Sequence, residues 1–280
     1  MKNQYFLGRW AILISCGLLL AVPAAAQSHR TIQGLQVWPE LQGELALHNG
    51  DYLLLALRGQ RATDYPNSDY DGRSLGFDER RLTVAYEHFW SDQWSLGGTA
   101  RVQSFGNRQL AVVPELLLRH RSAVGPLTFG QRLSLERTFP NNAGYYGGPG
   151  PEGQTFLRLR VDLEKEVPVG SGGFALRPRL SYEAATHVRL QKAADAASER
   201  FIQFTSLRAE VGFRVSEYFD VTPWFAYQTN YLITLPQYNA MGNQISGGNL
   251  NLVTPVVGLE ARFSLLKNKP ITERQLPTQH

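Results

Sequence analysis

Residues 155 to 167 alternate apolar and charged side chains almost without interruption. The stretch reads TFLRLRVDLEKEV, with leucine or valine at 157, 159, 161 and 163 and charged side chains between them. Successive side chains of a β-strand point to opposite faces of a sheet, so the apolar set shares one face and the charged set shares the other. A helix would scatter both sets. The stretch therefore predicts a strand with one apolar face and one charged face.

The same alternation recurs in eleven segments that cover most of the chain. The predicted strands are residues 34–48, 51–61, 79–90, 93–105, 109–121, 126–138, 154–167, 174–187, 201–215, 218–231 and 251–265. Sustained helical periodicity of useful length is absent from the sequence. The pattern predicts an all-β protein without an internal domain boundary.

Strand length and connection length favour a membrane barrel. The predicted strands are about 11 to 15 residues long, whereas strands of soluble proteins usually have about 5 to 6. Short connections tend to alternate with long ones at 62–78, 139–153, 188–200 and 232–250, although the short segment 106–108 stands where a long one is expected. Tight turns on one rim and long loops on the other are typical of outer-membrane barrels. A soluble sandwich or lipocalin-like barrel would instead bury the apolar face and expose the charges.

The expected fold is a single antiparallel transmembrane β-barrel of about twelve strands, with ten as the alternative. Eleven segments are visible in the pattern, but single-chain bacterial barrels have even strand numbers. We therefore expect either one further short strand or one segment that is a loop.

The first 26 residues resemble a secretory signal peptide. Lys2 and Arg9 precede an apolar run from Trp10 to Val22, and small residues at 24–26 suit cleavage before Gln27. An alternative is a lipoprotein signal around Cys16, the chain's single cysteine. The expected organisation is a signal peptide at 1–26, the barrel at 27–266 and a polar tail at 267–280.

Arginine dominates the basic residues. Lysine and arginine together number 28, and five of these are lysine, which leaves 23 arginines. Arginine forms bidentate, partly desolvated pairs with carboxylates, whereas lysine is the usual solvated cation. The arginines are interleaved with acidic residues on the strands of an exported chain, so we expect ion pairs rather than a surface that binds nucleic acid.

In a membrane barrel the apolar face contacts lipid and the charged face lines the lumen. A turn around Val169 would place Glu164 opposite Arg177, Asp162 opposite Arg179 and Arg158 opposite Glu183, and a turn at 123–124 would place Glu115 opposite Arg132. We predict a lumen crossed by arginine and glutamate ladders. The predicted lumen residues are Arg158, Arg160, Asp162, Glu164, Arg177, Arg179, Glu183, Glu115, Arg132, Arg208, Glu210 and Arg214.

Three stretches resemble a family of bacterial outer-membrane β-barrels of unknown function, common in Bacteroidetes. They are FDERRLTVAYEHFWSDQWSLGGTARVQ at 77–103, PELLLRHRSAVGPLTFGQRLSLERTF at 114–139, and TFLRLRVDLEKEV with LRPRLSYEA after it. The resemblance implies a barrel in the outer membrane and implies no reaction.

Catalytic and metal-binding motifs are scarce. The six histidines show no metal-binding spacing, and neither HExxH nor GxSxG occurs. We therefore expect no cofactor, no metal site and no enzymatic activity. The alternative is a lipid-processing hydrolase, because His120 and Ser122 share one face of a strand, and this short motif resembles that of outer-membrane deacylases. A carboxylate should orient the histidine, and Glu136 has the wrong face in the expected register.

The expected function is that of a monomeric, non-enzymatic outer-membrane barrel. It is either a narrow channel for small anionic or zwitterionic solutes or a structural barrel, and excess arginine in the lumen would favour anions. The expected partners are outer-membrane lipids, the barrel-insertion machinery and small solutes.

Overall fold

The computed structural model describes residues 29–47, 51–64, 75–105, 109–140, 153–170, 174–189, 200–242 and 244–265. The expected signal peptide and polar tail, the connection at 106–108 and most of the long loops lie outside these ranges. Among the described residues, no helix is long and apolar enough to cross a bilayer.

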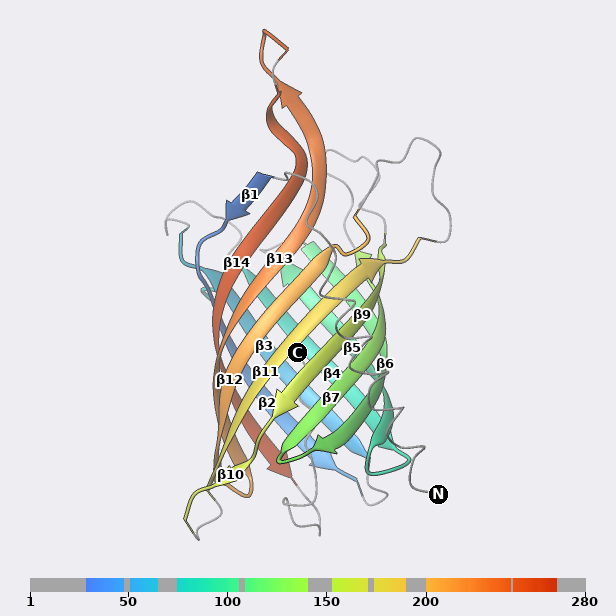
Figure 1. Ribbon diagram of the computed structural model, residues 1–280, viewed down its shortest axis with the longest axis vertical. Coiled ribbons are helices and arrows are strands. Elements are labelled where there is room, and N and C mark those ends of the chain that lie inside the picture. Colours follow the sequence, from blue (N-terminus) through green and yellow to red (C-terminus); the bar gives the residue numbers. More distant parts are fainter. Residues whose placement is uncertain are drawn as a thin grey trace.

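Eleven long strands of the described chain form one sheet that closes into a barrel (Figure 1). They are β2 (Gln36–Ala46), β3 (Tyr52–Ala62), β4 (Glu79–Phe89), β5 (Trp94–Phe105), β6 (Gln109–Val124), β7 (Leu127–Arg137), β9 (Thr155–Glu164), β11 (Ala175–His187), β12 (Phe204–Ser216), β13 (Phe219–Tyr238) and β14 (Gln244–Leu265). Each overlaps one of the eleven predicted segments. The short strands β1 (His29–Ile32), β8 (Phe139–Pro140) and β10 (Val167–Pro168) extend the same sheet.

The barrel closes through a parallel pair of strands. β14 pairs with β2 in parallel from Val256 and Gln36 to Leu265 and Leu45, whereas the other neighbouring pairs of long strands are antiparallel. With an odd strand number, the first and last strands run in the same direction, so their closing pair must be parallel. The expectation of twelve or ten strands was therefore wrong. A parallel pair also satisfies the backbone donors and acceptors, so the need to leave no open edge does not require an even number.

The β1 strand prolongs this closing seam towards the rim that carries the long connections. It also pairs with β14 in parallel, and the pairing offset changes by one residue between Ile32 and Gln36. The segment 29–46 thus lies along β14, with an irregularity at 33–35 between β1 and β2.

The β13–β14 hairpin rises above the rest of the barrel (Figure 1). Its strands pair up to Tyr238 and Gln244, although the sequence pattern predicted a long loop between residues 232 and 250. The loop was predicted because the alternation of apolar and charged residues ends there. Above the barrel, neither face of a strand contacts lipid or the lumen, so neither face needs to be uniformly apolar or charged. Backbone pairing continues there without a pattern to reveal it.

Apolar side chains cover the outside of the barrel. The exposed apolar side chains on the long strands include Leu41, Leu55, Leu57, Leu82, Val84, Leu96, Leu116, Leu133, Leu135, Leu159, Leu180, Leu207, Phe225 and Leu259. Soluble monomers rarely expose contiguous apolar patches larger than about a few hundred Å². Charged and polar side chains are buried on the inner face instead. This distribution is that of a transmembrane barrel and the reverse of a soluble one.

Candidate functional site

The inner face of the barrel carries the charged residues selected from the sequence pattern. The structure places there Glu115 of β6, Arg132 of β7, Arg158, Arg160, Asp162 and Glu164 of β9, Arg177, Arg179 and Glu183 of β11, and Arg208, Glu210 and Arg214 of β12. Each lies at a position that alternates along its strand with outward apolar residues. The alternation of the strands thus brings all twelve into one lumen.

The cross-strand partners within the lumen differ from those predicted. Glu164 lies opposite Arg179, and Arg160 lies opposite Glu183, which is a shift of two residues from the expected register. The turn between β9 and β11 is centred one residue later than expected, and a shift of two preserves the face of every side chain. The charges therefore stay in the lumen with new direct neighbours, and Arg158 still bonds to Glu183, diagonally across the two strands, at 2.9 Å.

The β6–β7 hairpin shows a larger shift. Its turn is Gly125–Pro126, where Gly125 adopts a φ of 61°, so Glu115 lies opposite Glu136 and Arg119 opposite Arg132. The predicted pair of Glu115 and Arg132 is wrong, because the turn falls two residues later than the one assumed, at the glycine that can adopt a positive φ. Two like-charged pairs thus face each other and find partners elsewhere.

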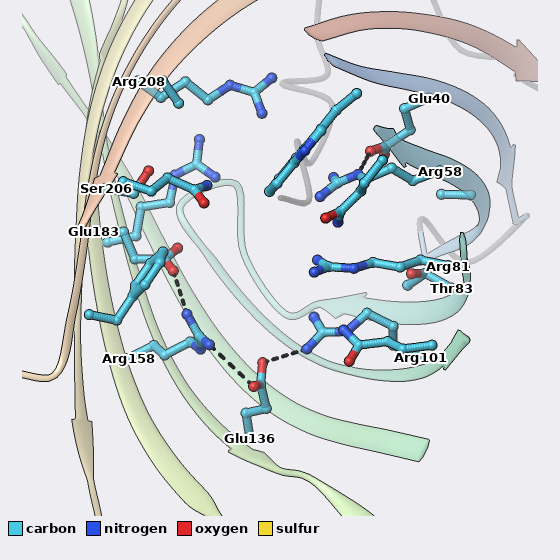
Figure 2. Close-up of a pocket in the computed structure, with 18 of the residues that line it drawn as sticks. Glu40, Arg58, Arg81, Thr83, Arg101, Glu136, Arg158, Glu183, Ser206 and Arg208 are labelled. Carbon is cyan, nitrogen blue, oxygen red and sulfur yellow. Dashed lines mark hydrogen bonds and ion pairs between the residues drawn. The ribbon is translucent and has the colours of Figure 1, made fainter. Parts of the chain in front are cut away.

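A chain of ion pairs crosses the half of the lumen next to the long connections (Figure 2). Glu136 accepts from Arg101 at 3.0 Å and from Arg158 at 3.2 Å. Glu183 accepts from Arg158 at 2.9 Å and from Arg132 at 3.1 Å. Three guanidinium groups therefore share two carboxylates.

These ion pairs border a cavity of about 440 Å³. Its lining includes seven arginines (58, 81, 101, 132, 158, 160 and 208) and four glutamates (40, 115, 136 and 183), a formal excess of three positive charges. Amide and hydroxyl groups complete much of the polar lining. The volume lies within the range of small-molecule pockets, and the charge favours anions.

One wall of this cavity is aromatic. Trp38 and Trp224 meet edge to face, with ring centroids 5.8 Å apart, and pack with Ala226 and Val256. The Arg208 guanidinium lies 4.0 Å from the Trp224 ring centroid, and the Arg58 guanidinium lies over Trp38. Tryptophan faces attract cations, so these contacts help to hold arginines that outnumber the carboxylates.

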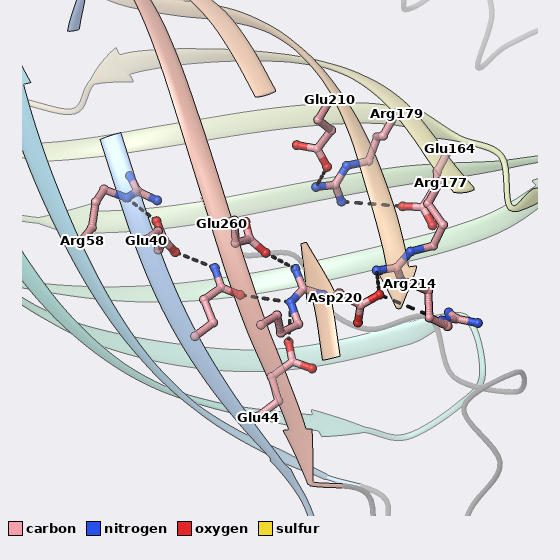
Figure 3. Close-up of polar contacts among 12 residues, drawn as sticks. Glu40, Glu44, Arg58, Glu164, Arg177, Arg179, Glu210, Arg214, Asp220 and Glu260 are labelled. Atoms are coloured by element: carbon pink, nitrogen blue, oxygen red, sulfur yellow. Dashed lines mark hydrogen bonds and ion pairs between the residues drawn. The ribbon is translucent and has the colours of Figure 1, made fainter. Parts of the chain in front are cut away.

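The other half of the lumen is occupied by a second set of charged and polar side chains (Figure 3). We call Gln42, Glu44, Arg177, Asp220, Glu260 and Arg262 the basal network. Arg262 bonds to Glu260, lies 3.7 Å from Glu44 and donates to Gln42 at 3.2 Å. Arg177 donates to Asp220 at 2.9 Å. All six side chains are buried, and none lines the cavity.

A further cavity of about 400 Å³ lies between β9, β11 and β12 and the base of the raised hairpin. It shares Arg158, Phe204 and Asn230 with the first cavity. The Arg200 guanidinium lies 4.9 Å from the Tyr231 ring centroid in its lining. The two cavities are thus neighbours along the lumen.

Several lining residues were missed from the sequence. Glu40, Arg58, Arg81, Arg101 and Glu136 occupy alternating positions on strands whose alternation was recognised, so the same rule, extended to β2–β5 and β7, would have found them. The two tryptophans had no such signal. An aromatic residue on an inward position is equally consistent with ordinary strand formation.

The residues of the hydrolase alternative lie on the outer face. His120 packs its ring against Trp94, with centroids 4.4 Å apart, and Ser122 follows on the same face. Glu136 points into the lumen, bonded to Arg101 and Arg158. Within the described ranges, no carboxylate bonds to His120, and no group of three or more histidine, cysteine or acidic side chains is arranged to hold a metal.

No family model matches the chain, and no curated protein matches it. A solved structure described as the NanC porin in a rhombohedral crystal form is 14% identical, covers 74% of this chain and 86% of its own, and superposes with a TM-score of 0.38. A likeness this loose bears on neither fold nor function, so the fold rests on the chain's own strand pairing.

Proposed function

We propose that the protein is a non-enzymatic outer-membrane barrel that receives small anionic solutes in its lumen. The observation that carries the proposal is the cavity in which seven arginines face four glutamates. Rings of arginine select anions in pores because their fields concentrate negative ions and repel cations.

The outer surface supports the location in a membrane. Trp90 and Trp94 stack with their ring centroids 6.3 Å apart, beside the short connection between β4 and β5. Tyr218 is exposed at the turn between β12 and β13, where Phe219 and Phe263 also pack together. Aromatic residues beside the apolar band suit a membrane interface.

The basal network bears on transport. Its buried side chains occupy the lumen on the side of the short turns, whereas the cavity lies on the side of the long connections. We infer that solutes enter from the long-loop side and that the basal network keeps the lumen closed at the opposite end until its side chains move.

Single-channel recording in planar bilayers tests this function. We expect brief, low-conductance steps, and the reversal potential in a potassium chloride gradient should have the sign of anion preference. Steps that prefer potassium would contradict the proposal. Hydrolysis of lipid by the refolded protein, lost in Ser122→Ala, would favour the enzymatic alternative.

A further inference from the structure

Arg160 differs from the other arginines around the cavity. Its side chain is buried, with the residue 4% exposed, and lines the cavity. Its Nη2 donates to the Ser181 hydroxyl at 3.3 Å. Within the described part of the chain, no carboxylate lies within ion-pair distance of it. A buried guanidinium without a bonded carboxylate is costly, which points to a ligand that completes its hydrogen bonds.

The charges around Arg160 are mostly positive, which favours an anion beside it. Arg132 lies directly opposite Arg160 on β7, and the positive charges of Arg179 and Arg208 also act on it. Glu183 lies opposite on β11, but its carboxylate accepts hydrogen bonds from Arg132 and Arg158. Asp162 is the acidic residue whose charge acts on Arg160 most strongly, without forming an ion pair.

The position of Arg160 suits a bound group at the end of the cavity. Arg158 and Arg160 line it, whereas Asp162, the next inward residue of β9, does not. The Ser181 oxygen accepts from Arg160, so its own hydrogen remains to donate. A guanidinium and a hydroxyl donor together match a carboxylate, because both carboxylate oxygens accept hydrogen bonds.

The rest of the cavity indicates what the carboxylate is attached to. Gln36, Gln60, Gln103, Gln228, Thr83 and Thr254 contribute amides and hydroxyls to the lining. Such groups both donate and accept hydrogen bonds, as the hydroxyls of a ligand do. A hydroxylated organic acid therefore fits better than a hydrocarbon acid.

We propose that Arg160 and Ser181 form a binding site for the carboxylate of a small hydroxylated organic acid. This site deepens the proposed function, since it makes the lumen a place where one class of anion binds and not only a positively charged space. Arg160 supplies the charge, Ser181 the additional donor, and the amide and hydroxyl lining holds the body of the ligand.

Calorimetric titration of the full-length barrel in detergent micelles tests the site. The probe is gluconate, and sorbitol serves as its uncharged counterpart. We expect gluconate to bind, sorbitol not to bind, and Arg160→Gln to weaken gluconate binding by about tenfold or more. The matched variant Arg101→Gln removes an equal charge from the same cavity, from an arginine that is already paired with Glu136. It should weaken binding by only about twofold.

The outcomes separate the site from a diffuse charge effect. Equal losses in Arg160→Gln and Arg101→Gln, or equal binding of sorbitol and gluconate, would overturn the proposal. Binding of chloride without binding of gluconate would also overturn it, since the cavity would then hold an adventitious ion only. If Arg160→Gln does not fold, Ser181→Ala retains every charge and should still weaken gluconate binding by about tenfold, the effect of losing one hydrogen bond to a charged acceptor.

The same protein in bilayers tests transport separately. Gluconate binding that depends on Arg160, without any ion conductance, would leave the site intact and refute the channel. Anion-selective conductance with unchanged gluconate binding in Arg160→Gln would refute the site and leave the channel.

Discussion

Glu183 lies directly opposite Arg160 in the β9–β11 register, yet its carboxylate bonds to Arg132 and Arg158. In this lumen, the residue directly opposite a carboxylate is therefore not always the residue that bonds to it. Long side chains extend beyond their direct cross-strand neighbours. A carboxylate therefore bonds to the arginines with which it makes the better hydrogen-bond geometry. Among the described arginines that line the cavity, Arg160 is then the one bonded to a hydroxyl and to no carboxylate.

Glu183→Gln should destabilise the barrel and increase its anion preference. The change removes the carboxylate shared by Arg132 and Arg158, so we expect the free energy of unfolding to fall by about 1 to 3 kcal/mol. Urea unfolding in lipid vesicles measures it. Glu115→Gln is the control, because it makes the same change in charge at a carboxylate whose described hydrogen bond comes from the Thr99 hydroxyl and not from arginines. Equal losses of stability in both variants would contradict the role of the shared carboxylate.

Removing a basal ion pair should open the lumen. In the double variant Arg177→Ser and Asp220→Ser, both charges disappear together and two small hydroxyls replace long side chains, so we expect larger conductance steps with little change in selectivity. The control is Arg58→Ser with Glu40→Ser, an ion pair of equal charge beside the cavity. Conductance that rises equally in both double variants would show that the basal network does not close the lumen.

Engineered cysteines test the parallel closure. Leu41 and Ala261 are direct partners in the β2–β14 register and lie on the outer face. Their backbones should lie about 4.8 Å apart, close enough for a disulfide after mild oxidation. Cysteines at 41 and 257 share the face but lie out of register, and should remain reduced. Mass spectrometry of the oxidised protein distinguishes the pairs, and crosslinking of the second pair alone would refute the register.

An arginine on the outer face should be costly in lipid. Leu116 lies near the middle of β6 and is exposed, so Leu116→Arg should make folding into vesicles less favourable by about 2 to 4 kcal/mol. Thr83→Arg places the same charge in the lumen cavity and should cost much less. Reversible folding into vesicles measures both. A soluble barrel would tolerate Leu116→Arg readily, because the new charge would face water.

The strands and their faces were predictable because both depend on local chemistry. Side chains alternate across a strand whatever its partners, so leucine and arginine at successive positions of β9 specify its lipid face and its lumen face. The lumen positions of Arg158 and Glu183 follow from this period alone. Errors in register did not disturb it, since the shifts at both hairpins were even numbers of residues.

The direct cross-strand neighbours of the charges could not be predicted from the pattern. Turn geometry sets the register, and the turn at Gly125 differs from the one that the charges alone suggested. The strand number was also misjudged, because parallel closure of β2 on β14 joins segments from opposite ends of the chain.

The sequence by itself determined that the chain forms long two-faced strands, apolar outside and charged inside, since the period of two is a property of each strand alone. Only the tertiary structure decided that eleven strands close, that the basal network fills one half of the lumen, and that Arg160 has Ser181 rather than a carboxylate as its bonded neighbour. Those outcomes depend on distances between side chains of different strands, and closure of the barrel sets these distances.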